Sequence, residues 1–298
     1  MKQKILLSAN AKINLFLTAV GTLADGYHEI VSVMHAVDLC DRVRLSLAPS
    51  ARRSVKIVTN RGGIPTDERN IAYRAAMAFF DAADRTGALK IYLSKSIPAA
   101  GGMAGGSADG AAVLRGLNRL CGSPLSAARI SELAAALGAD VPFCCHGGSA
   151  LCTGTGTTVT PLSTAARLRL LIVPSAEGVS TPWAYSELDR TFGDLSAERE
   201  ASAARLACLR AALADGDVPA LCDAMYNIFE RVVLPARPLA ARAKDLLLAN
   251  GARGAMLSGS GPTVFGIFTD AAAQKRAARA LRAQGYAPVA CGSALRKE

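Results

Sequence analysis

The sequence lacks several features that would assign a protein to a class at once. No run of about 20 apolar residues occurs among its 298 residues, and the N-terminus, M-K-Q-K-I-L-L-S-A-N, lacks the continuous apolar core of a signal peptide. Only 5% of the residues are aromatic, and they do not alternate with basic residues as in a platform that stacks nucleic-acid bases. We therefore expect a soluble, cytoplasmic protein with neither membrane nor nucleic acid as its partner.

The eight cysteines also lack the spacing of a disulfide framework or a metal site. No two of them form a C-x-x-C pair, and they are scattered from Cys40 to Cys291. The one local cluster comprises Cys144, Cys145, His146 and Cys152, and side chains on adjacent residues diverge. We expect reduced thiols and no zinc site.

Positive charge is what the chain has in excess. Its net charge is +10 and its pI is near 9.4, which favours an anionic partner: nucleic acid, membrane lipid or a phosphorylated metabolite. Many arginines fall on helical patterns such as Q-K-R-A-A-R-A-L-R (274–282), where a charged, solvated helix face explains them. A basic RNA-binding module therefore remains only as an alternative to an enzyme that handles a phosphorylated small molecule.

Hydrophobic periodicity predicts strands and helices without the regular alternation of a doubly wound sheet. With 51% hydrophobic residues the chain can form two domains, and we place the boundary near residue 165, giving domains 1–165 and 166–298. In the first domain the predicted strands are 13–20, 43–47, 55–58 and 89–93, and the predicted helices are one capped by Thr66, 111–120 and 126–137. In the second they are strand 168–173, helices 197–215 and 236–250, a strand–turn–strand at A-M-L-S-G-S-G-P-T-V-F-G-I-F, helix 271–284 and strand 286–291. The order is typical of an α+β fold with helices on one face of a sheet.

A glycine-rich loop leads directly into one of these helices, in P-A-A-G-G-M-A-G-G-S-A-D from Pro98 to Asp109. Glycines before a helix let backbone N–H groups approach an anion, and the helix N-terminus adds partial positive charge. The common P-loop supplies a lysine after its last glycine, but no lysine follows a glycine anywhere in this chain. Either the loop holds no phosphate or its cation comes from another segment. Ser107 could cap the helix, coordinate a metal, or do both.

One candidate cation is Lys12, in the strand N-A-K-I-N-L-F-L. Ala11, Ile13 and Leu15 fall on one face of that strand, whereas Lys12 and Asn14 share the other. The pattern fits a half-buried sheet with a wet face, and it equally fits a fixed cation on a rigid element.

A candidate base is Asp140, in L-G-A-D-V-P-F. It follows a helix end and precedes Val141-Pro142, which we expect the proline to hold extended. An aspartate there often serves a turn. Its apolar neighbours also allow a partly desolvated carboxylate that acts as a base.

Together these motifs resemble the GHMP kinases. The resemblance rests on A-K-I-N-L-F-L, D-G-Y-H-E-I, the glycine loop, L-G-A-D-V-P-F and S-G-S-G-P-T-V-F, in this order from about Ala11 to Phe268. It implies an N-terminal domain like the second domain of ribosomal protein S5, a ferredoxin-like C-terminal domain, ATP and Mg²⁺ as cofactors, and a small-molecule substrate. D-G-Y-H-E is typical of a member whose substrate carries a cytosine base; homoserine or mevalonate kinases are the alternative.

The resemblance also implies a set of site residues. Lys12 and Asp140 match the catalytic lysine and base, and Ser107 matches a magnesium ligand. The matched substrate-binding residues are Asn14, Tyr27, His28, Lys95, Thr181 and Tyr185, with Tyr27 and Tyr185 sandwiching the base; Trp183 could replace Tyr185. The matched ATP-binding residues are Asn70, Ile71, Pro98, Ala99, Ala100, Gly101, Gly102, Met103, Ala104, Gly105, Gly106 and Ser107.

The chain departs from the family in its loop. Ala100 and Ala104 stand where relatives often carry glycine, and Ala108 stands where a second serine is common. A methyl group at residue 104 matters if that residue needs a positive φ. From its own residues, D-G-Y-H-E equally fits an ordinary turn around Asp25-Gly26.

Overall fold

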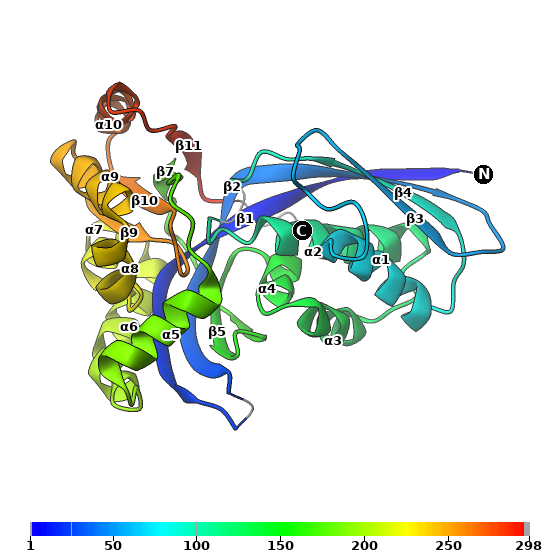
Figure 1. Cartoon of the computed structure of the whole chain (residues 1–298), viewed down its shortest axis with the longest axis horizontal. Helices are drawn as coiled ribbons and strands as arrows, with labels where there is room; N and C mark the ends of the chain where they lie inside the picture. Colours follow the sequence, from blue (N-terminus) through cyan, green and yellow to red (C-terminus); the bar gives the residue numbers. More distant parts are fainter. Residues whose placement is uncertain (1, 25, 99–100, 295–298) are drawn as a thin grey trace. The chain divides into compact units, whose positions relative to one another are not determined.

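The computed structural model describes residues 2–24, 26–98 and 101–294. Its residues group into two compact units that are interleaved in sequence: unit 1 (1–11, 39–97 and 104–147) and unit 2 (12–38, 98–103 and 148–298). Two long strands, β1 (Gln3–Thr22) and β2 (His28–Ala48), contribute to both units (Figure 1). The predicted boundary near residue 165 concerns a division along the sequence and stays a prediction.

Unit 1 combines a mixed sheet with four helices. Strand β4 (Ala88–Ser94) pairs antiparallel with β2 over Arg42–Ala48 and parallel with β3 (Ser54–Thr59). The helices are α1 (Ile71–Ala82), α2 (Gly105–Leu120), α3 (Ala127–Leu137) and α4 (Val141–His146), and they lie on one side of these strands in Figure 1. The predicted strands 55–58 and 89–93 and the helix after Ser126 are thus confirmed.

Two local predictions in unit 1 are wrong. The cap of α1 is Asn70 and not Thr66: the Asn70 side chain accepts a hydrogen bond from the N–H of Ala72, which an extended residue directly before the helix can do. The segment after Asp140 is helical and not extended. Pro142 lies in the first turn of α4, where its missing N–H has no intrahelical partner to lose.

Unit 2 contains the remaining strands and helices. Strands β5 (Ser149–Gly154) and β6 (Thr158–Pro161) extend from β2, and β8 (Tyr226–Asn227) pairs parallel with β1 at Phe16 and Leu17. The strand order of this sheet is β3-β4-β2-β1-β8. A second, antiparallel sheet has the order β11-β7-β10-β9, formed by β7 (Arg169–Val173), β9 (Gly254–Leu257), β10 (Val264–Phe268) and β11 (Val289–Gly292).

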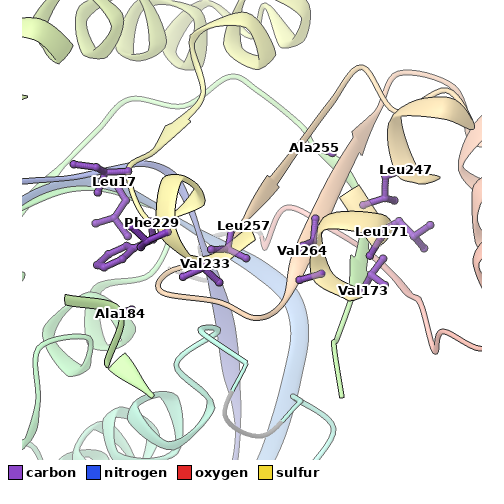
Figure 2. Close-up of a cluster of buried hydrophobic side chains, with 14 of the residues drawn as sticks. Leu17, Leu171, Val173, Ala184, Phe229, Val233, Leu247, Ala255, Leu257 and Val264 are labelled. Atoms are coloured by element: carbon purple, nitrogen blue, oxygen red, sulfur yellow. The ribbon is translucent and has the colours of Figure 1, made fainter. Parts of the chain in front are cut away.

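The helices of unit 2 bury an apolar core against these strands. They are α5 (Thr181–Phe192), α6 (Glu198–Asp215), α7 (Val218–Ala224), α8 (Glu230–Ala236), α9 (Pro238–Ala249) and α10 (Ala271–Ala283). Figure 2 shows the core, in which Leu17 of β1 and Phe229 beside α8 lie near Leu257 of β9. Each Å² of apolar surface that is buried stabilises the folded state by about 25 cal/mol, so this core contributes much of the stability of the unit.

Predictions for the second half of the chain are mostly confirmed. Helices were expected at 197–215 and 271–284 and strands at 168–173 and around S-G-S-G, and each is present within a few residues. Helices α5, α7 and α8 were not expected. Among the described residues, no helix has both the length and the apolar character needed to cross a membrane.

Candidate active site

Lys12 is a buried cation in the part of β1 that belongs to unit 2. Its side chain is on the polar face of the strand, yet the residue is only 3% exposed, which favours the fixed cation over the alternative of a wet face. Its Nζ donates hydrogen bonds to Oδ1 of Asn14 at 2.7 Å and to the carbonyl of Gly102 at 2.8 Å. The lysine that the glycine loop lacks is therefore in direct contact with that loop.

A chain of hydrogen bonds fixes Asn14 beside it. Nδ2 of Asn14 donates to Oγ of Ser32 on β2 at 2.8 Å, and Ser32 in turn donates to the carbonyl of Phe16 at 2.8 Å. Asn14 and Ser32 are both buried, and a buried amide with both ends bonded has one orientation. The sequence offered no signal for Ser32, because alternation along β2 does not show which strand lies opposite.

The first half of the glycine loop packs backbone against backbone with the S-G-S-G turn. A Cβ on Gly102 would lie 2.2 Å from the carbonyl oxygen of Ser258, and one on Gly101 would lie 2.4 Å from Oγ1 of Thr263. Ser258 also donates from Oγ to the carbonyl of Gly102 at 3.1 Å. Glycine is needed here for space as much as for its φ of +69° at Gly102. Ala99 and Ala100 lie outside the described residues.

The second half of the loop begins helix α2 in unit 1. Ala104 precedes the helix in a left-handed conformation, with φ +58°, so this position does require a positive φ although it carries a methyl group. Ser107 lies inside the first turn and does not cap the helix, which corrects that expectation. The residue is partly exposed. The N-terminal amides of α2 are those that the loop was expected to present.

Asn70 and Ile71, the predicted adenine contacts, begin helix α1. Nδ2 of Asn70 donates to the carbonyl of Pro65 at 2.7 Å while Oδ1 accepts from Ala72, so the amide holds the turn before the helix. A Cβ on Gly110 of α2 would lie 2.6 Å from Cγ2 of Ile71, so α1 and α2 approach closely here. A contact of Asn70 or Ile71 with adenine stays a prediction.

Lys95 lies in a buried charge cluster of unit 1. Its Nζ contacts the carboxylates of Asp41 and Asp109, two residues that sequence reasoning did not single out. Burial raises the pKa of the Asp109 carboxyl to about 7, against the opposing effect of the Lys95 charge. The contact of Lys95 with the substrate, implied by the resemblance, stays a prediction.

Asp140 is the residue directly before helix α4. Its side chain is partly exposed and does not cap the helix, and its backbone carbonyl accepts from the N–H of Cys144 at 3.0 Å. The short helix therefore fixes the backbone of Asp140.

The residues expected to bind a base lie together in unit 2. The rings of His28 and Tyr185 stack with centroids 4.5 Å apart, and Tyr185 makes an edge contact with Phe229 at 4.9 Å. Nε2 of His28 is 2.7 Å from Oδ1 of Asp189, one helical turn beyond Tyr185 on α5. Asp189 was missed because α5 itself was not predicted; on a helix, residues 181, 185 and 189 share one face.

The other predicted residues of this region are Trp183, Thr181 and Tyr27. The guanidinium of Arg237 lies 4.6 Å from the ring centroid of Trp183, so Tyr185 and not Trp183 is the aromatic beside His28. Oγ1 of Thr181 is 3.0 Å from Oγ of Ser260 in the S-G-S-G turn. Tyr27 is 67% exposed, a position from which its ring can cover a ligand.

Sequence comparisons place the chain among known proteins. The profile of the GHMP kinases N-terminal domain matches residues 70–148, and that of the GHMP kinases C-terminal domain matches residues 209–287. A 4-diphosphocytidyl-2-C-methyl-D-erythritol kinase of Synechococcus sp. (strain JA-2-3B'a(2-13)) is 40% identical over 285 residues, which are 95% of this chain and 91% of that protein. One of Thermosynechococcus vestitus is 42% identical over 270 residues, which are 88% of this chain and 86% of that protein.

Structural comparison agrees with them. A crystal structure of a 4-(cytidine 5'-diphospho)-2C-methyl-D-erythritol kinase matches with a TM-score of 0.77 and 31% identity, covering 98% of this chain and all of the other. The chain therefore belongs to the GHMP kinases, with their α+β fold, and within them to the family of the 4-diphosphocytidyl-2-C-methyl-D-erythritol kinases.

Proposed function

We propose that this chain transfers the γ-phosphoryl group of ATP to the 2-hydroxyl of 4-diphosphocytidyl-2-C-methyl-D-erythritol, a step of the non-mevalonate isoprenoid precursor pathway. The observation that carries the substrate assignment is the stack of His28 on Tyr185 with Asp189 bonded to the histidine. Homoserine and mevalonate have no flat base, so their kinases have no use for such a group.

The hydrogen bond to Asp189 selects the tautomer of the His28 imidazole. A carboxylate only accepts, so the shared proton is on Nε2 and, in the neutral imidazole, Nδ1 is an acceptor. An acceptor matches the exocyclic amino group of cytosine and mismatches the carbonyl of uracil at the same place. Tyr185, and Tyr27 from its exposed position, would contribute stacking that does not distinguish the two bases.

Lys12 and the amides at the start of α2 would bind the phosphates. Lys12 is held on a rigid strand by Asn14 and Gly102, so little ordering cost remains when its charge meets an anion. Positioning and electrostatic stabilisation supply most of the catalysis in phosphoryl transfer.

Asp140 would be the general base. The substrate hydroxyl oxygen attacks the γ-phosphorus, its proton passes to the Asp140 carboxylate, and the bond to the β-phosphate oxygen breaks to release ADP. A carboxylate on a partly exposed residue directly before a short helix fits this task, because the helix fixes its backbone.

The residues around Ser107 fit Mg²⁺. Ser107 is a partly exposed residue in the first turn of α2, beside the amides proposed for the phosphates, and its hydroxyl supplies a hard oxygen. When bound, the ion would neutralise charge on the transferred group. Ser107 would hold it with phosphate oxygens as the other ligands.

A coupled ADP-release assay tests the function directly. We expect turnover with the cytidyl substrate and none with homoserine or mevalonate at the same concentrations. Asp140→Asn should lower kcat by roughly 10²–10⁴ while leaving ATP binding within twofold, since a base acts on the transition state. Turnover only with homoserine or mevalonate would assign the chain to another GHMP kinase activity, and an Asp140→Asn variant with half the normal kcat would exclude Asp140 as the base.

Base recognition has its own test. His28→Ala should lower the preference for cytidyl over uridyl substrate, whereas Tyr185→Ala should weaken both by about 1–3 kcal/mol. Asp189→Asn should also reduce the preference, because an amide can donate to Nε2 and shift the imidazole proton to Nδ1. Equal kcat/KM for the two substrates in the unmutated enzyme would refute this account of the base site.

A further inference from the structure

Three charged side chains in unit 1 lie at both ends of the glycine loop. Lys95 follows strand β4, Asp41 is in β2, and Asp109 is in the second turn of α2. Their side chains are only 6%, 0% and 3% exposed. Nothing in the proposed chemistry requires charges to be buried at this place, so the cluster needs its own explanation.

Asp41 holds the chain that enters the loop. Its Oδ1 accepts hydrogen bonds from the backbone N–H of Ser96 at 2.6 Å and of Ile97 at 2.9 Å. Its Oδ2 accepts from Nζ of Lys95. One buried carboxylate thus fixes three consecutive residues immediately before Pro98.

Lys95 holds the chain that leaves the loop. Its Nζ donates to Oδ2 of Asp109 at 2.6 Å and contacts the carbonyl oxygen of Gly105, the first residue of α2, at 3.4 Å. Gly105 and Asp109 are four residues apart and therefore lie above one another on the same helix face. The ammonium thus binds the first turns of the helix whose N-terminal amides are proposed to bind the phosphates.

The composition of the cluster is poor for stability alone. Two carboxylates share one ammonium, which leaves a net negative charge in the interior whenever Asp109 is ionised, and Oδ1 of Asp109 is buried without a partner among the described residues. Apolar side chains of similar volume often stabilise a protein as well as a buried ion pair does. What an ion cluster adds is contacts of defined geometry, because each charge-assisted hydrogen bond specifies the position of one backbone segment.

We propose that Asp41, Lys95 and Asp109 are positioning residues for the nucleotide phosphates: they fix both ends of the glycine loop so that the first amides of α2 are held in place for the anion. This inference rests on the proposed ATP-dependent function. It gives Lys95 an indirect role in place of a direct contact with the nucleotide or substrate, because both carboxylates already engage its ammonium.

The test uses a neutral cluster of similar size. Lys95→Met alone would leave two buried carboxylates facing each other, and we expect this variant to fail in folding. The triple variant Asp41→Asn, Lys95→Met, Asp109→Asn removes all three charges together and keeps an amide oxygen at residue 41 for the Ser96 and Ile97 amides. A matched control is Glu230→Gln with Lys244→Met, since Glu230 also binds both a lysine and a backbone N–H, that of Leu257.

We expect the folded triple variant to raise the KM for ATP at least tenfold and to change the KM for the cytidyl substrate less than twofold. Amide hydrogen exchange in peptides covering 101–107 should be faster than in the unmutated protein, and the control pair should leave the KM for ATP within twofold. A folded triple variant with an unaltered KM for ATP and unaltered loop exchange overturns the inference alone. An unmutated protein that neither binds nor turns over ATP refutes the proposed function, and the inference with it.

Discussion

The two units bury polar groups in different ways. Unit 1 buries charge, in the cluster of Lys95, Asp41 and Asp109. Unit 2 buries the cation Lys12 and, away from it, a neutral network: His35 on β2 lies between the hydroxyls of Ser149 at 2.7 Å and Ser293 at 2.9 Å. The charged cluster holds backbone segments by directed contacts, and burial raises the pKa of its member Asp109 to about 7, whereas the buried imidazole of His35 keeps its place only while it is neutral.

Two individual glycines, one from each unit, differ in what an added Cβ would meet. In unit 2 a Cβ on Gly102 meets backbone, whereas in unit 1 a Cβ on Gly110 meets the side chain of Ile71, which can shift. Ala104 occupies a left-handed conformation with a methyl group in place. Lack of space against a backbone is therefore a stricter reason for glycine than the sign of φ.

The strongest way to break this comparison is Gly102→Ala. The new methyl would lie 2.2 Å from the carbonyl oxygen of Ser258, and φ is +69°, so we expect a loss of about 4 kcal/mol in the free energy of unfolding measured in urea. Gly106→Ala is the control, since its Cβ would meet only Ile71 at 3.7 Å and a helical alanine is favoured. Similar stabilities of the two variants would contradict the role of backbone contact.

The neutral network of unit 2 should make the free energy of unfolding depend on pH below neutrality. Burial, with a smaller effect of the Arg167 charge, lowers the pKa of His35 from 6.5 to about 4. Between these values the unfolded chain binds the proton and the folded one does not, so His35 makes stability fall as the pH is lowered from 6.5 to 4. The loss should total about 3 kcal/mol and level off at lower pH.

His35→Gln isolates that effect. The difference in unfolding free energy between the unmutated protein and this variant should be constant above pH 6.5 and shrink below it, whereas Asp109, with its raised pKa, acts equally in both proteins. A difference that does not depend on pH between 7 and 4 would show that His35 titrates normally.

Gly110→Ala sharpens the contrast from the side of unit 1. Its Cβ would lie 2.6 Å from Cγ2 of Ile71, a side-chain atom, so we expect a loss of about 2 kcal/mol, less than for Gly102→Ala. Adding Ile71→Ala removes that atom. The free energy of unfolding of the double variant should therefore be at most about 0.5 kcal/mol lower than that of Ile71→Ala alone. Simple addition of the two losses would place the clash elsewhere.

The smallest expected effect has the opposite sign. Ala104→Gly should stabilise the protein by about 1 kcal/mol, because glycine adopts the left-handed conformation without the cost that a Cβ imposes. The same exchange at Ala108, inside α2, should destabilise by about 1 kcal/mol. Equal shifts of both urea midpoints would show that residue 104 is not strained.

Sequence patterns predicted the elements whose local signals are strong. The helix from Ser126 has a capping serine and a terminating glycine, and both are found at its ends. Helix α5 escaped prediction because only Ala184 and Leu188 are buried on it, which leaves little apolar periodicity. Thr66 was preferred to Asn70 as a cap because both residue types cap helices and only the fold shows where the helix begins.

The sequence by itself determined the motifs: a lysine on the first strand, a glycine loop before a helix, and D-G-Y-H-E, which together indicated a GHMP kinase. Only the tertiary structure decided which side chains meet them. Asp41 and Asp109 bind Lys95, and Asp189 binds His28 across 161 positions of the chain. Strand and helix periods report which face a residue takes, whereas the identity of a partner depends on how distant segments pack, and no local pattern encodes that.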